Sequence, residues 1–207
     1  MCSLPVLLAV FYIVIMTPLM GRKNGYTVDA TPSFQLTRAI VATGDWFPPE
    51  KVKQGYVYSL VYIPFYAAGQ VLEAWLPSPE PDWIPRKCLC WMNTVLTGLT
   101  VGLLAGVLGR LGYSPGAQAF VPLAYGFSTL AFAYARYDYN KCLAALLLLS
   151  AFSYAVIYLV NKNPRAVIGC GVAMGLLVTV RLEMAAAGVA LFGVIALNTD
   201  RWAARRN

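Results

Sequence analysis

The 207-residue sequence contains no histidine, and charged residues make up only 12% of it. The absence of histidine excludes Ser-His-Asp and Cys-His catalysis, histidine-ligated metal sites and histidine proton relays. Any acid–base chemistry therefore has to use carboxylates, lysine or tyrosine.

Apolar side chains are in excess. Hydrophobic residues make up 59% of the sequence and the mean hydropathy is +0.61, outside the usual balance of a soluble domain. This composition predicts an integral membrane protein. We expect a multi-pass protein of the cell (inner) membrane, surrounded by lipid and with no nucleic-acid partner. The five cysteines lie in or beside apolar runs, and the single Cys-x-Cys has no second ligand pair. They are interpreted as small core residues, and neither a metal nor a cofactor is predicted.

Hydropathy predicts six membrane spans, at 4–20, 88–109, 119–135, 142–160, 166–180 and 184–197. The first lacks the basic n-region and cleavage site of a signal peptide, so an uncleaved helix is expected. A single helix over 166–197 would be about 48 Å long at about 1.5 Å per residue, with Arg181 and Glu183 near mid-bilayer. A central arginine costs about 2.5–3.5 kcal/mol on insertion scales, which favours a two-helix hairpin. The expected fold is an all-α, polytopic helix bundle that forms one transmembrane domain over residues 1–207.

The segment 56–72 is ambiguous. It is about 17 residues long, the lower limit for a span, and carries four tyrosines and a central Pro64. Tyrosine prefers the headgroup level, and a mid-segment proline frees a carbonyl that hydrocarbon cannot satisfy. We interpret the segment as a helix in the membrane interface; a seventh span is the alternative.

Short-loop charges set the predicted orientation, with the amino terminus in the cytoplasm. Six basic residues then lie inside and three outside: Arg110, Lys162, Arg165, Arg201, Arg205 and Arg206 against Arg136, Lys141 and Arg181. The loop 21–87 lies outside despite its seven basic residues, because loops longer than about 60 residues translocate largely regardless of charge.

This first external loop contains a predicted amphipathic helix. Thr31 and Pro32 form a helix start, and Gly44 is a natural stop. The apolar stripe between them consists of Phe34, Leu36, Ile40 and Val41, while Gln35, Thr37 and Arg38 are expected to stay polar. Asp29 precedes the helix, where the macrodipole favours an ionised carboxylate. A solvated loop residue or auxiliary cap is the alternative for Asp29.

The order of these segments resembles the GT-C superfamily of membrane glycosyltransferases, in particular the protein O-mannosyltransferases and the bacterial aminoarabinose transferases of lipid A. The resemblance runs from residue 5 to 198 through a first span, an acid, a helix ending in "ATGDW", the segment "YIPFYAAGQVLEAWL" and the basic start of "RKCLCWMNTVLTGLTVGLL". It implies transfer of a sugar from a polyprenyl-phosphate donor to a hydroxyl acceptor on the external side.

By the same resemblance, Asp29 matches the catalytic acid of the first external loop. The family often has two adjacent acids there, whereas here the second position is Ala30. Asp138, in "RYDYNK", matches a second external acid, or is half of a loop ion pair with Arg136 or Lys141. Arg181 matches a basic residue at the outer end of the fifth span, or is an interfacial arginine paired with Glu183. The expected substrate-binding residues are Arg38, Tyr58, Tyr62, Arg136, Lys141 and Arg181.

Two other function classes are open, a membrane scaffold built on a partial GT-C module and a transporter or flippase subunit. A transporter predicts internal repeats or paired broken helices, and the sequence contains no convincing repeat. Family members typically continue with more spans, so the chain is expected to be a truncated form, or a module completed by a second membrane subunit. Glycines four apart, at 98, 102 and 106 and at 171 and 175, predict close helix packing.

Overall fold

The computed structural model describes residues 3–16, 30–46, 56–136 and 140–204, with the side chains of Ala30 and 198–204 excepted. Every regular element in these ranges is helical, which confirms the all-α prediction. The α-helices are α1 (Leu4–Ile15), α2 (Ala30–Thr43), α3 (Tyr56–Glu73), α4 (Trp83–Arg110), α5 (Pro115–Ser128), α6 (Leu130–Ala135), α7 (Lys141–Asn161), α8 (Pro164–Val180) and α9 (Ala185–Ala204). A 3₁₀ turn over Leu182–Met184 connects α8 to α9.

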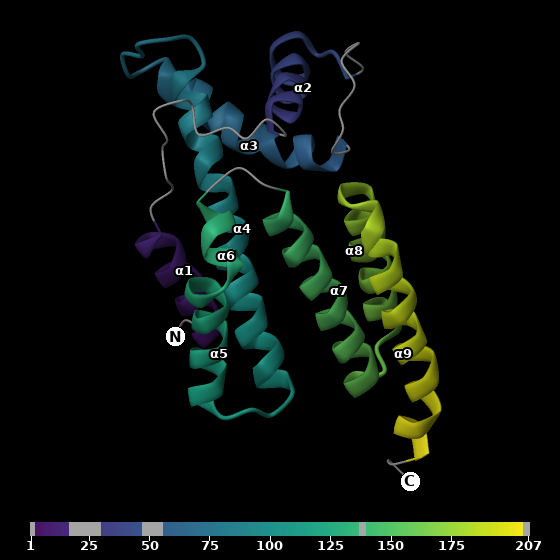
Figure 1. Ribbon diagram of the computed structural model, residues 1–207. Coiled ribbons are helices and arrows are strands. Elements are labelled where there is room, and N and C mark those ends of the chain that lie inside the picture. The colour runs from purple at the N-terminus through teal and green to yellow at the C-terminus, as the bar shows by residue number, and fades with distance from the viewer. Residues whose placement is uncertain (1–2, 17–29, 47–55, 137–139, 205–207) are drawn as a thin grey trace.

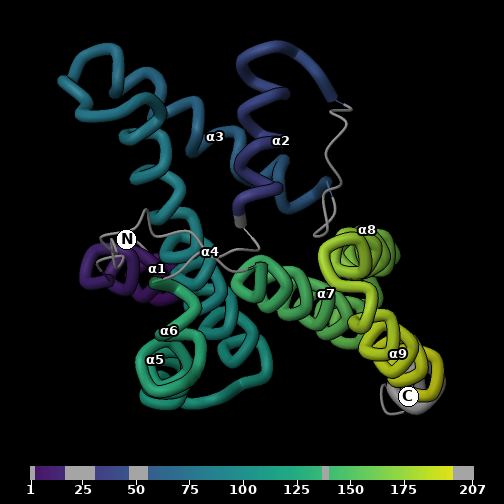
Figure 2. The backbone as a smooth tube through the Cα atoms, turned by 45° about the horizontal axis from the view of Figure 1, so that its top comes forward, coloured from purple at the N-terminus to yellow at the C-terminus, as the bar shows by residue number. Residues whose placement is uncertain are grey.

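The long helix α4 is the centre of the fold. It contacts α1, α3, α5, α6 and α7, and it lies between two groups of helices, which Figure 2 shows with the upper end of the molecule turned forward. One apolar cluster joins α1 to α4 and α6 through Leu8, Tyr12, Val101 and Ala135. The other joins α2, α3 and α4 to α7, α8 and α9. The two groups meet along α4 and α7.

The apolar segments alternate in direction along the chain. In Figure 1, α4 descends, α5 and α6 ascend, α7 descends, α8 ascends and α9 descends. Helices α2 and α3 lie together at the upper end, so the α4–α5 and α7–α8 connections lie at the opposite end. Two helices in the described part, α4 and α7, are long and apolar enough to cross a membrane. Helices α1 and α8 are apolar but shorter.

The predicted amphipathic helix is present as α2. It begins at Ala30, one residue before the predicted cap Thr31, and ends at Thr43. Gly44 follows with a φ of 70°, the left-handed conformation that stops a helix. Phe34, Leu36 and Ile40 are buried, as the stripe predicted. Thr37 was expected to be polar and exposed, but it is buried.

Thr37 is buried because α3 covers it. Its hydroxyl lies 2.9 Å from the carbonyl oxygen of Ser59 and 2.8 Å from that of Ser33. A threonine that hydrogen-bonds to backbone carbonyls can be buried at a helix contact without an unsatisfied donor. Helix α3 itself is continuous through Pro64 and lies across the upper end, in contact with α2, α4 and α8 (Figure 1).

Two helix interruptions bear on the predicted spans. The segment 166–197 is two helices, because the chain leaves the helix at Arg181, whose φ and ψ are −149° and 104°. This confirms the two-helix hairpin. The segment 119–135 was predicted as one helix but is divided at Thr129 into α5 and α6. Two carbonyls before the break gain hydroxyl donors, since Thr129 donates to Tyr125 and Tyr12 donates to Gly126.

The glycine prediction is correct for one set and wrong for the other. A Cβ at Gly102 would lie 2.7 Å from the carbonyl oxygen of Pro5, and one at Gly98 would collide with the side chain of Ile13, so α1 packs closely on α4 here. A Cβ at Gly171 or Gly175 would meet nothing within 4 Å. Those two glycines face open space because α8 packs through its other faces.

Candidate functional site

A cavity of about 420 Å³ lies between the two groups of helices. Its walls are Thr97 of α4, Tyr125 of α5, residues 129–131 and Tyr134 at and after the α5–α6 break, several residues of α7, and Arg181 and Met184 of the α8–α9 connection. Two predicted substrate-binding residues, Lys141 and Arg181, line this one cavity although they are forty residues apart in the chain. Because α7 begins and α8 ends at the end of the bundle that carries α2 and α3, both cations lie toward that end.

Lys141 is oriented by an aromatic neighbour. Its ammonium donates a 2.8 Å hydrogen bond to the hydroxyl of Tyr134 and lies 4.2 Å from the centre of that ring. Since Lys141 is the first residue of α7 and Tyr134 belongs to α6, this contact joins the two walls of the cavity. A positive charge held in this way at a cavity wall can bind an anionic group.

Arg181 has a carboxylate partner within the same connection. Its Nε donates a 2.7 Å hydrogen bond to Oε1 of Glu183, and Nη2 contacts the same oxygen. The pairing that was one of the two alternatives for Arg181 is therefore present. The pKa of Glu183 is lowered, first by a hydrogen bond from its own backbone N–H and then by the one from Arg181. The carboxylate thus carries its charge at neutral pH.

Thr97 contributes a buried hydroxyl without a partner. The residue is 2% exposed, lines the cavity, and its Oγ1 has no hydrogen-bond partner within the described residues. It belongs to a polar stripe on α4 that also contains Asn93, Thr94 and Thr100, all buried. Buried hydroxyls are almost always hydrogen-bonded, so an orphaned one at a cavity wall points to a ligand or water in the cavity.

A second, apolar cavity of about 630 Å³ continues the first. The two share Tyr125, Ala145 and Leu148 as lining residues. The remaining walls of the second cavity are Thr100, Leu104, Leu149, Phe152, Ala187, Ala190, Leu191 and Val194. Together the cavities have a cationic part beside Lys141 and Arg181 and an apolar part along α7 and α9.

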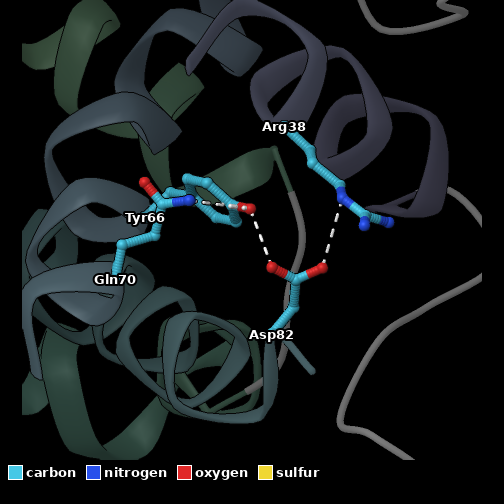
Figure 3. Close-up of polar contacts among 4 residues, drawn as sticks. All are labelled: Arg38, Tyr66, Gln70 and Asp82. Carbon is cyan, nitrogen blue, oxygen red and sulfur yellow. Dashed lines mark hydrogen bonds and ion pairs between the residues drawn. The ribbon is translucent and has the colours of Figure 1, made fainter. Parts of the chain in front are cut away.

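Arg38 lies away from both cavities, in a polar network between α2, α3 and α4 (Figure 3). Its Nε lies 3.2 Å from Oδ2 of Asp82, and the side chains of Arg38 and Asp82 are 56% and 12% exposed. Tyr66 donates a 2.8 Å hydrogen bond to Oδ1 of Asp82, and Gln70 donates to the Tyr66 hydroxyl at 3.4 Å. Burial and the contact with Asp82 raise the pKa of Tyr66 to about 12. This network connects the helices and places Arg38 in a structural contact.

Three other predicted substrate-binding residues, Tyr58, Tyr62 and Arg136, line neither cavity. Tyr58 and Tyr62 are fully buried in the helix core, with their ring centres 4.9 Å apart, so these two predicted substrate-binding residues lie in a packing contact. Arg136 ends α6 and lies over the ring of Phe132, 5.3 Å from its centre. Asp29 and Asp138, the two predicted catalytic acids, lie outside the described residues. Among the residues that are described, no three of the Cys, Asp and Glu side chains form a metal-binding group.

Thr97 and Tyr134 of the cavity, and Asp82 of the Arg38 network, were not predicted from the sequence. Thr97 could have been found from the stripe at 93, 94, 97 and 100, which repeats at helical spacing on an otherwise apolar span. Asp82 precedes the start of α4 in "PDWIP", a typical cap position, although its own φ of 61° is left-handed and its side chain does not cap the helix. No sequence signal points to Tyr134, because its contact with Lys141 depends on where the α5–α6 interruption lies.

Comparisons with protein-family models, with curated proteins and with solved structures give no match for this chain.

Proposed function

We propose that this chain is a polytopic membrane protein that binds a polyprenyl-phosphate sugar and transfers the sugar to a hydroxyl acceptor at the external surface. The observation that carries the proposal is that two cations, Lys141 and Arg181, line one cavity, and that this cavity continues into the second, apolar cavity. A lipid-linked sugar has the same two parts, an anionic phosphate and a long hydrocarbon chain. The phosphate fits the cationic part and the chain fits the apolar cavity.

Exposed apolar side chains support the membrane part of the proposal. Large apolar residues are exposed along α1, α5, α6, α8 and α9, among them Val14, Phe120, Leu130, Ile168, Val172, Val189 and Leu197. Soluble monomers rarely expose contiguous apolar surface beyond a few hundred Å². Lipid would cover these side chains if the six predicted spans cross the bilayer. The upper end in Figure 1, which carries α2, α3, the start of α7 at Lys141 and the end of α8 before Arg181, is then external.

The chemistry needs a base and a cationic site, and both residue types are present. A carboxylate takes the proton of the attacking hydroxyl, and arginine or lysine stabilises the charge on the departing lipid phosphate. Lys141 and Arg181 supply the cations, and Asp29 is the proposed base, with Asp138 as the second acid. The sugar leaves the phosphate oxygen as its bond to the acceptor oxygen forms, so no metal or redox cofactor is needed in this scheme.

The alternative functions are a non-catalytic scaffold and a transporter or flippase subunit. The transporter alternative requires internal repeats or paired broken helices. One broken pair, α5 and α6, lines the cavity, and the described residues contain no second break of that kind within a span. A scaffold predicts no ligand in the cavity, which a binding experiment decides.

The test is binding of polyprenyl phosphate to the full chain in phosphatidylcholine nanodiscs, followed by native mass spectrometry. Polyprenol, which lacks the phosphate, is the matched control ligand. Lys141→Gln and Arg181→Gln should each weaken binding by roughly 10- to 100-fold, the usual value of a charged hydrogen bond. Arg165→Gln, an exposed cation at the opposite end of α8, should leave binding unchanged. Equal binding of the two lipids, or no effect of either cavity variant, would reject the proposal.

A further inference from the structure

The guanidinium of Arg181 is occupied by Glu183 on one of its two forked donor edges. Nε and Nη2 both contact Oε1 of Glu183. These two nitrogens form one of the forked donor edges with which arginine binds carboxylates and phosphates through two parallel hydrogen bonds. A phosphate that binds Arg181 through its Nε and Nη2 has to take the place of the Glu183 carboxylate.

Glu183 can leave at low cost. Its side chain is 58% exposed and that of Arg181 is 28% exposed, so water can solvate the carboxylate once the pair separates. Exposed ion pairs contribute little net free energy, because solvent screens them and both side chains lose freedom. Glu183 also lies in a three-residue 3₁₀ turn, and no other hydrogen bond from the side chain of another residue to its carboxylate is present in the described part of the chain.

The position of the pair connects it to the cavity. Arg181 and Met184 both line the cavity, and Glu183 lies between them in the chain. The carboxylate is therefore at the cationic end, where it lowers the positive potential that an anion would experience. Its removal should raise the affinity for anions, whereas its removal from a purely structural pair would leave ligand affinity unchanged.

We infer that Glu183 is a displaceable counter-ion that competes with the ligand's phosphate for Arg181, and so determines how strongly an anionic group must bind to occupy the site. This inference rests on the proposed function, since it presumes that the cavity takes a phosphate. Specificity follows from the competition. A lipid phosphate displaces the carboxylate, while a zwitterionic headgroup, whose ammonium cancels part of its attraction, does so less readily.

The inference is tested with Glu183→Gln in the full chain, in phosphatidylcholine nanodiscs. Two probes distinguish the source of the phosphate, polyprenyl phosphate and free inorganic phosphate. For polyprenyl phosphate the variant should bind about two- to fivefold more tightly than the natural sequence, the range expected for an exposed ion pair. Glu80→Gln, the same change at an exposed glutamate of the α3–α4 connection, should have no effect.

The double variant Arg181→Gln/Glu183→Gln, together with the two single variants, completes a double-mutant cycle. In the Arg181→Gln background, removal of the carboxylate should no longer increase affinity, because the shared guanidinium is gone. An effect of Glu183→Gln on inorganic phosphate as well assigns the site to phosphate chemistry in general, and an effect on the lipid probe alone assigns it to lipid phosphates; both support the competition.

The outcomes separate the two proposals. If the natural sequence binds polyprenyl phosphate but Glu183→Gln binds equally or less tightly, the counter-ion inference is wrong and the proposed function stands. A gain that persists unchanged without Arg181 also overturns the inference. If the natural sequence and every variant fail to bind either probe, the proposed function fails and the inference fails with it.

Discussion

The hydroxyl of Tyr66 donates a 2.8 Å hydrogen bond to Oδ1 of Asp82, and this contact ties the middle of α3 to the start of α4. Tyr66 is buried, and the other carboxylate oxygen of Asp82 is engaged by Arg38. The position of α2 and α3 above the bundle therefore depends on a small polar contact as well as on apolar packing.

Tyr66→Phe should destabilise the protein by about 1.5–3 kcal/mol, the range for a hydrogen bond to a charged group. The ring and its packing are kept, so the loss reports the hydroxyl. Chemical denaturation in detergent measures the effect. Tyr113→Phe, at an exposed tyrosine in the α4–α5 connection, is the matched control and should change the unfolding free energy little. Equal losses in the two variants would contradict the role of the Asp82 contact.

The same hydroxyl predicts a pH dependence. The pKa of Tyr66 is raised from its ordinary value of 10.0 to about 12, by burial first and then by the bond to Asp82. Between these values the unfolded chain loses the proton while the folded chain keeps it, so unfolding releases a proton and stability falls as pH rises. The contribution is fully present below pH 10. The unfolding free energy, measured by chemical denaturation at several pH values between 9 and 12, should fall less steeply with pH for Tyr66→Phe than for the natural sequence.

Two glycines with different surroundings form a matched pair. Gly102→Ala places a Cβ 2.7 Å from the Pro5 carbonyl and 2.9 Å from the Ala9 side chain, so α1 has to move away from α4 at a cost of about 1–3 kcal/mol. Gly175→Ala meets open space and should be neutral or stabilise by up to about 1 kcal/mol through helix propensity. Thermal unfolding measures the stability of each variant against that of the natural sequence. A loss at Gly175 as large as that at Gly102 would show that α8 has a packing partner on that face.

Thr97→Val tests whether the orphaned hydroxyl faces a ligand. Valine has nearly the same shape and removes only the hydrogen-bonding group, which has no protein partner within the described residues. Stability should therefore be unchanged or slightly higher, while polyprenyl phosphate binding should weaken by roughly fivefold to tenfold for the loss of one hydrogen bond of about 1 kcal/mol or slightly more. Thr94→Val is the control and should leave binding unchanged, because Thr94 lines neither cavity and its hydroxyl bonds to the carbonyl of Ala135. Unchanged binding in Thr97→Val would show that the ligand does not reach α4.

Asp29 carries the catalytic hypothesis. Asp29→Asn keeps the size of the side chain but removes its proton affinity, so sugar transfer should fall by about 100- to 10,000-fold, the usual contribution of a general base. The assay supplies a polyprenyl-phosphate sugar, a hydroxyl acceptor and any second subunit that the reaction needs. Asp45→Asn, in the exposed segment after the Gly44 stop, is the control and should leave transfer unchanged. Equal losses in both variants would remove the base assignment.

Local patterns predicted the helices well and the site only in part. The stop at Gly44 and the break at Arg181 follow from conformation and charge at single positions, and both are present. Thr37, Tyr58 and Tyr62 were assigned to polar or ligand-facing roles, yet they are buried, because their surroundings depend on how α2 and α3 pack on other helices. Likewise, nothing in the spacing indicates that Lys141 and Arg181 share a cavity. That juxtaposition requires the antiparallel α7–α8 pair.

The polar stripe of α4 has a consequence for how a ligand arrives. Thr97 is near the middle of this 28-residue helix, so each end of the helix is about 20 Å away at about 1.5 Å per residue. Under the proposed topology, a group that reaches Thr97 has left the aqueous phase and its mobile ions behind. Raising the ionic strength should then slow the approach to the exposed Arg181 but hardly loosen a contact already made at Thr97. A long hydrocarbon chain has a shorter route, sideways from the surrounding lipid.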